Sequence, residues 1–156
     1  MNEAKLGFNW PVRVYYEDTD AGGVVYYANY LKFFERARTE WLRAIGINQL
    51  SLAQSHNVMF VASSTAVDYH APARLDDELK VSVVVERLGR ASLQLVQQAW
   101  RVDQGSLSLL TGGRIRIGCV DATSFRACAI PDDILARIST INEPMAIPNT
   151  INQNKS

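Results

Sequence analysis

The sequence is short of the features by which several classes of protein are recognised. Its 156 residues hold 2 cysteines, and 16 basic residues balance 16 acidic ones. Without a basic excess, neither nucleic acid nor an anionic membrane surface is expected as a partner. No apolar run reaches the roughly 18 residues of a transmembrane helix. The first residues also lack the continuous apolar segment of a secretion signal. We therefore expect a cytoplasmic protein of one domain.

Motifs for several common chemistries are also missing. Cys119 and Cys128 lack the spacing of a zinc or redox pair, and we expect them to pack in a reducing compartment. His56 and His70 have no metal-ligand spacing between them. No Walker A, GxGxxG or GxSxG motif occurs. The sequence therefore predicts no metal and no cofactor.

The periodic segments predict one long helix among several strands. Residues 10–16 alternate between two faces, which is typical of a strand. From about Ala28 to Ile45, apolar residues recur at steps of three and four, which predicts an amphipathic helix that Gly46 ends. Four further strand-like segments follow, at residues 58–71, 79–88, 91–102 and 106–120. Turns are expected at Gly89-Arg90 and at Asp103–Gly105.

The order of these elements predicts an α+β fold with two layers. Consecutive hairpins imply an antiparallel sheet, and the long helix would cover one of its faces. Pro131, followed by two acids, predicts a short helix after the last strand. Residues 1–140 are expected to form the domain. Residues 141–156, with two prolines and a polar end, are expected to be a loose tail. Sheet surface left uncovered by a single helix favours dimerisation.

The last strand allows a prediction about side-chain direction. Leu107 and Leu109 lie an even number of residues from Ile115. Because side chains alternate along a strand, all three are expected on one face, with Arg114 and Arg116 on the other.

The acidic turn before the helix, DTDAGG, is the candidate for chemistry. A calcium loop would need an oxygen ligand where Gly22 stands and a glutamate where Asn29 stands, so that interpretation fails. Asp18 is expected to form the turn and to favour the helix start. Asp20 precedes a glycine pair and lies near a helix start whose free N–H groups can bind an oxyanion. A carboxylate beside an oxyanion site is a minimal arrangement for acyl hydrolysis.

Two long motifs carry a resemblance to a known family. They are WPVRVYYEDTDAGGVVYYANYLKFFERARTEWLR and YHAPARLDDELKV. They resemble the 4-hydroxybenzoyl-CoA-thioesterase-like branch of the hot-dog-fold acyl-CoA thioesterases, especially its YbgC subgroup, which is associated with the Tol-Pal system. The resemblance implies a hot-dog fold, in which a five-stranded antiparallel sheet wraps one long central helix. It also implies hydrolysis of an acyl-CoA to a free acid and CoA-SH by a homodimer or homotetramer.

The resemblance also implies roles for individual residues. Asp20 matches the catalytic carboxylate, which attacks the thioester carbonyl or activates a water that does so. Backbone N–H groups around Tyr27 would hold the oxyanion. The YbgC subgroup usually has histidine at that position, so no role of an imidazole is carried over. Gly22, Gly23 and Asn29 are expected to shape the mouth of the site, either by contact with the substrate or through turn and cap chemistry alone.

Coenzyme A carries phosphates, so a cation is expected near the site. Arg90 lies in a turn where the family places basic residues and is the first candidate. Arg87 and Arg74 are weaker candidates. Other hot-dog thioesterases use a glutamate on the helix as the base, which makes Glu35 an alternative to Asp20.

The substrate and partners are open at this point. Aromatic residues such as Phe34 and Phe60 are candidates for lining an acyl pocket, although core packing is the default for each. The alternative function is a non-catalytic or weakly catalytic module that binds acyl carrier protein or envelope-system partners.

Overall fold

The computed structural model describes residues 7–146, and for residues 141–146 it describes the backbone alone. Within these residues the chain forms five strands, three α-helices and a short 3-10 turn at Tyr16–Asp18. Their order is β1 (Phe8–Arg13), α1 (Asn29–Ala44), α2 (Gln49–His56), β2 (Val58–Tyr69), β3 (Glu78–Leu88), β4 (Ser92–Asp103), β5 (Ser106–Asp121) and α3 (Asp132–Ala146).

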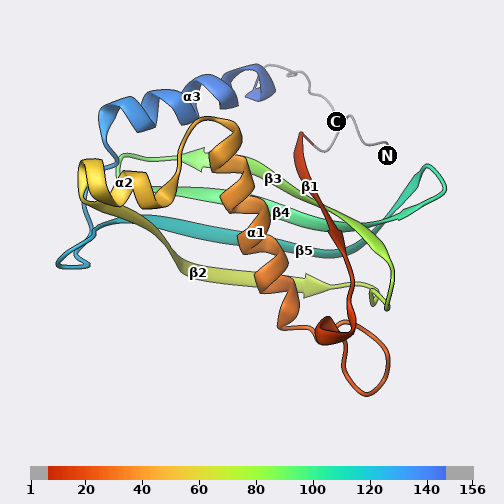
Figure 1. Cartoon of the computed structure of the whole chain (residues 1–156). Helices are drawn as coiled ribbons and strands as arrows, with labels where there is room; N and C mark the ends of the chain where they lie inside the picture. Colours follow the sequence, from red (N-terminus) through yellow and green to blue (C-terminus); the bar gives the residue numbers. More distant parts are fainter. Residues whose placement is uncertain (1–6, 147–156) are drawn as a thin grey trace.

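All five strands join in one antiparallel sheet in the order β1-β3-β4-β5-β2. Helix α1 lies across one face of this sheet, and α2 and α3 lie toward the end of the sheet that is far from the start of α1 (Figure 1). The predicted α+β architecture of one long helix and five antiparallel strands is therefore confirmed. None of the helices in the described part of the chain combines the length and apolarity needed to cross a bilayer.

Helix α1 forms where the three- and four-residue spacing predicts it. Its buried side chains face the sheet and are Tyr30, Phe33, Phe34, Ala37, Trp41 and Leu42. Phe33 and Phe34 are fully buried, and burial of each such ring stabilises the fold by about 1.5–3 kcal/mol. The helix ends at Ala44, and Gly46, two residues later, has a φ of 84°, in the left-handed region that glycine adopts without strain.

A buried amide connects α1 to the middle of the sheet. Gln97 on β4 is fully buried, and its Nε2 donates to the carbonyl of Phe34 at 3.0 Å. Its Oε1 accepts a hydrogen bond from Arg38 at 3.1 Å. A polar group buried this deeply is tolerated because both ends of the amide have partners.

Strand β5 differs from the prediction at a bulge. Ala99 pairs with Thr111, but Trp100 pairs with Leu109, so Leu110 is an extra residue in β5. The extra residue reverses the alternation. Leu110 is therefore buried, and Leu107 and Leu109 lie on the face opposite Ile115, so the prediction for these two leucines is wrong.

Helix α3 is longer than the sequence predicts. It begins at Asp132, where the two acids occupy the first turn, and it continues to Ala146. Residues 141–146 are therefore helical and do not belong to a loose tail; the rest of the expected tail, 147–156, lies outside the described residues. Pro144 predicted an earlier stop, because proline has no N–H donor and its ring crowds the preceding turn, but the backbone is helical on both sides of it.

The close approach of α1 to β5 gives a test of the packing. A Cβ at Gly113 would lie 3.2 Å from both the Phe34 ring and the Ala66 carbonyl, whereas a Cβ at Gly118 would meet nothing within 4 Å. We expect Gly113→Ala to lower the free energy of unfolding by about 1–3 kcal/mol, because the core is overpacked. Gly118→Ala, in the same strand, is the control and should be neutral or slightly stabilising. Equal urea midpoints for the two variants would contradict this account.

Candidate active site at the start of helix α1

Asp20 lies in a small hairpin loop between β1 and α1. The loop is closed by a bridge between Thr19 and Val25. The Asp20 N–H donates to the Val24 carbonyl at 2.9 Å, and the Gly23 N–H donates to the Asp20 carbonyl at 3.0 Å. Gly23 has a φ of 79°, which a residue with a side chain would adopt only with strain. The glycine pair thus allows the turn that presents the carboxylate.

The Asp20 carboxylate is exposed and only partly engaged. Its Oδ1 accepts the Gly22 N–H at 2.8 Å. Its Oδ2 accepts no hydrogen bond from any described residue. One oxygen therefore fixes the direction of the side chain, and the other is free to act.

Asp18 has a structural role, as predicted, but it is buried. It is 4% exposed, and its Oδ2 accepts the Tyr15 N–H at 2.9 Å. Its carbonyl accepts the Tyr26 N–H at 3.0 Å and the side-chain amide of Asn29 at 2.8 Å. The Asn29 side chain is thus used to hold the loop against the first turn of α1.

The backbone before α1 has two unused donors. The N–H groups of Tyr27 and Ala28 donate to no described residue. Their peptide groups are nevertheless held, because the Asn29 N–H donates to the Tyr26 carbonyl at 2.8 Å and the Tyr69 hydroxyl donates to the Tyr27 carbonyl at 3.1 Å. Free, oriented N–H groups at a helix start attract negative charge. The predicted oxyanion role of this backbone requires such donors, and it stays a prediction.

Aromatic rings connect this backbone to the core. Tyr69, at the end of β2, has its ring centre 5.7 Å from those of Tyr27 and Tyr30, and Tyr30 contacts Phe33. Burial, and secondarily the nearby Tyr27 and Tyr30 hydroxyls, raise the pKa of Tyr69 above its ordinary value. The Tyr69 hydroxyl therefore remains protonated at neutral pH and remains a donor.

The structure does not bring Arg90 to Asp20 within one chain. Val24 bridges to Arg74, just before β3 begins, whereas Arg90 follows the end of β3. The 11 residues of β3 span about 36 Å. Arg90 is exposed at the end of the sheet near α2 and α3, opposite the Asp20 loop (Figure 1). Arg74, ranked lower from the sequence, is the arginine beside the loop.

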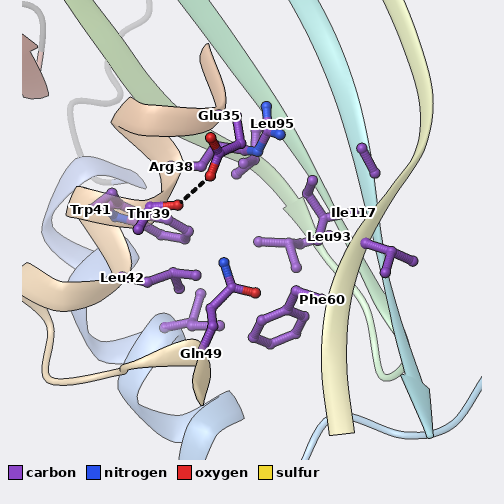
Figure 2. A pocket seen from close by; sticks show the side chains of 13 residues that line it. Glu35, Arg38, Thr39, Trp41, Leu42, Gln49, Phe60, Leu93, Leu95 and Ile117 are labelled. Carbon is purple, nitrogen blue, oxygen red and sulfur yellow. Dashed lines mark hydrogen bonds between the residues drawn. The ribbon is translucent and has the colours of Figure 1, made fainter. Parts of the chain in front are cut away.

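A pocket of about 300 Å³ lies between α1, α2 and the sheet. Its walls come from α1 (Glu35, Arg38, Thr39, Trp41, Leu42), α2 (Gln49), β2 (Phe60, Val61, Ala62), β4 (Leu93, Leu95), β5 (Ile117) and α3 (Ile138). Of the two aromatic candidates, Phe60 lines this pocket and Phe34 is core. Glu35 lies at the pocket, and its Oε2 accepts the Thr39 hydroxyl at 2.7 Å (Figure 2). No residue of the Asp20 loop lines it.

Apart from Glu35, the polar residues of this pocket (Arg38, Thr39 and Gln49) were not predicted from the sequence. Arg38 interrupts the apolar stripe of α1, and that interruption was the available signal. Among the described residues, no group of three or more His, Cys, Asp or Glu side chains is arranged to hold a metal ion.

Comparison with known proteins agrees with this architecture. A model of the thioesterase-like superfamily matches residues 14–138. The acyl-CoA thioesterase YbgC of Haemophilus influenzae is 42% identical over 130 residues, which are 83% of this chain and 93% of that protein. The acyl-CoA thioester hydrolase YbgC of Escherichia coli O6:H1 is 44% identical over 129 residues, with the same shares of both chains.

Solved structures give the same answer. A probable thioesterase from Bartonella henselae, 31% identical, matches with a TM-score of 0.72 over 79% of this chain and 98% of its own. The sheet wrapped around one long helix is thus the hot-dog fold of thioesterases, as the resemblance implied. The chain belongs to the thioesterase-like superfamily, and its resemblance to the YbgC subgroup is confirmed.

The hydroxyl of Tyr69 can be tested separately from its ring. Tyr69→Phe keeps the ring contacts but removes the bond to the Tyr27 carbonyl. We expect Tyr69→Phe to lower the free energy of unfolding by about 0.5–1 kcal/mol, because one hydrogen bond is lost. Tyr16→Phe is the control, because Tyr16 is 80% exposed. A urea midpoint of Tyr69→Phe equal to that of the wild type would show that the hydroxyl does not stabilise this peptide.

Proposed function

We propose that the protein hydrolyses acyl-CoA thioesters to a free carboxylic acid and CoA-SH. The observation that carries the proposal is the free Oδ2 of Asp20 in a loop that leads directly to the unused N–H groups of Tyr27 and Ala28. The names of the relatives that are 42% and 44% identical support this activity.

The proposed chemistry needs a carboxylate, two donors and water. Asp20 attacks the thioester carbonyl, or it removes a proton from a water that attacks. Negative charge then develops on the carbonyl oxygen, where the free backbone N–H groups stabilise it. The C–S bond breaks, the thiolate takes up a proton, and one water is consumed in total, without a metal or cofactor.

The two routes differ in where the oxygen of water goes. An anhydride between Asp20 and the acyl group forms only on the nucleophilic route. A single turnover in heavy-oxygen water can label Asp20 on that route alone, whereas the general-base route places all of the label in the released acid.

The edge strand β2 supports the partner expected from the fold, a second copy of the chain, in a homodimer or in a pair of such dimers. Its 12 residues carry no proline, and no charge precedes Asp68. An uncovered edge of this kind is a template for pairing with another strand. Antiparallel pairing of two β2 strands around a twofold axis places the Tyr69 end of one strand against the Val58 end of the other.

Such a dimer would complete the site. Tyr69 contacts the catalytic backbone, whereas Phe60 at the other end of β2 lines the 300 Å³ pocket. Gly118 of β5 pairs with both Val61 and Ser92, so the Arg90 turn lies at the same end of the sheet as that pocket. Asp20 of one protomer would thus face the pocket and Arg90 of its partner.

The assignment of Asp20 can be tested by an isosteric change. We expect Asp20→Asn to lower kcat by about 10²–10⁴-fold, the usual contribution of a positioned base, while the fold is retained. Glu17→Gln, an exposed change three residues away, should leave kcat unaltered. Hydrolysis of several acyl-CoAs at the wild-type rate by Asp20→Asn would reject the assignment. Loss of turnover in Glu35→Gln alone would assign the base to Glu35.

The dimer can be tested at its edge. Light scattering should give twice the mass of the chain or a multiple of that value. Thr65→Lys, which adds a charge to β2, should shift the mass toward one chain and reduce kcat, because each site needs both protomers. Asn9→Lys on the opposite edge strand, β1, is the control and should remain dimeric. A monomeric wild type with full activity would contradict the dimer.

Acyl carrier protein presents the same thioester bond, so it is a second form in which the acyl group can arrive. A pull-down of acyl carrier protein, together with no hydrolysis of any acyl-CoA, would favour the alternative of a binding module. The expected location remains the cytoplasm, and the distribution of a tagged full chain tests it.

A further inference from the structure

The pocket beneath α1 has apolar walls and one polar margin. Phe60, Leu42, Leu93 and Ile117 supply aliphatic and aromatic surface, and Arg38 is the single cation among the lining residues. A volume of about 300 Å³ is at the lower end for ligand pockets, so the occupant is small. The side chains converge on one space from α1, α2 and the sheet (Figure 2).

Arg38 has far more donors than partners. A guanidinium carries five N–H donors. Arg38 uses one nitrogen to donate to Gln97 at 3.1 Å, and it forms no ion pair with a described carboxylate. Burial lowers the pKa of Arg38 below its ordinary value, and the charge of Glu35 opposes that effect. A partly buried cation with a neutral partner leaves strong hydrogen-bonding capacity toward the pocket.

The other polar side chains of the pocket do not satisfy this cation. Glu35 is exposed, and its Oε2 is engaged by Thr39. Gln49 extends from α2 toward the middle of the pocket, where its amide can donate to the same ligand (Figure 2). The pocket therefore offers the guanidinium N–H donors of Arg38, the side-chain amide of Gln49 and an apolar wall.

From this arrangement we infer that the pocket binds a small aliphatic carboxylate, with the carboxylate on Arg38 and the hydrocarbon against Phe60, Leu93 and Ile117. Carboxylate and guanidinium match as paired acceptors and donors. The ligand has two sources: the free acid itself, or an acyl group of a CoA thioester that ends in a second carboxylate. The second source rests on the proposed function, whereas binding of the free acid does not.

Calorimetry on the full chain tests the site without any assay of activity. Hexanoate should bind on the order of ten times more tightly than hexanamide, which has the same chain and no charge. Arg38→Met should reduce hexanoate to the level of hexanamide. Arg36→Met is the control, since Arg36 is an exposed arginine of the same helix outside this pocket, and it should bind hexanoate as the wild type does.

Because Arg38 also donates to Gln97, Arg38→Met could lower binding by disturbing the fold. A second variant therefore tests the pocket with Arg38 in place. Phe60→Trp leaves Arg38 intact but fills the pocket, and it should abolish binding of both probes. Glu35→Gln removes a nearby negative charge and should strengthen hexanoate binding severalfold. Equal binding of hexanoate and hexanamide to the wild type, or hexanoate binding that survives Phe60→Trp, would overturn the inference.

A comparison of two CoA thioesters then shows whether the ligand of the pocket is a free acid or the acyl group of a thioester. If the acyl group is the ligand, glutaryl-CoA should be hydrolysed with a higher kcat/KM than valeryl-CoA, and Arg38→Met should abolish that preference. Hexanoate binding without a preference for glutaryl-CoA assigns the site to the free acid. Absence of all hydrolysis would reject the proposed function. The calorimetry would still show whether the pocket binds a small aliphatic carboxylate.

Discussion

One buried amide fixes the position of the long helix on the sheet. Gln97 reaches from the central strand β4 to the carbonyl of Phe34 in the middle of α1, and its other end accepts Arg38. Apolar packing alone would allow α1 to slide or rotate on a smooth surface, whereas a fully buried amide has one arrangement in which both its ends are satisfied. The start of α1 and the pocket near its middle are both placed by this link.

Most of the fold was predictable because its signals are periodic. The change from alternation to three- and four-residue spacing located α1, and consecutive hairpins predicted that the sheet is antiparallel. The strand order was not predicted, because β1 pairs with β3 and β2 pairs with β5, which are not consecutive in the sequence. The bulge at Leu110 was not predictable, because Leu107, Leu109 and Leu110 are all apolar and either alternation satisfies the composition. The length of α3 was also missed, because Pro144 is a helix-breaking signal that this helix nevertheless accommodates in its last turn.

The candidate site was predictable to a different degree at each residue. The Asp20 loop and the backbone at Tyr27 are local in sequence, and the structure supplies the free groups that the prediction requires. Arg90 could not be placed by local reasoning, because its distance from Asp20 depends on which end of β3 each occupies. Arg38 was overlooked for a related reason: its partner Gln97 is 59 residues away.

The regular rise and rotation of α1 set the position of Arg38 relative to the start of the helix. Nine residues separate Asn29, where α1 begins, from Arg38 at the pocket, which corresponds to about 13.5 Å of rise and two and a half turns. Insertion of one residue between them would move Arg38 by about 1.5 Å and rotate it by about 100°, off Gln97 and away from the pocket. The contact between Arg38 and Gln97 therefore fixes the number of residues between the start of α1 and the pocket.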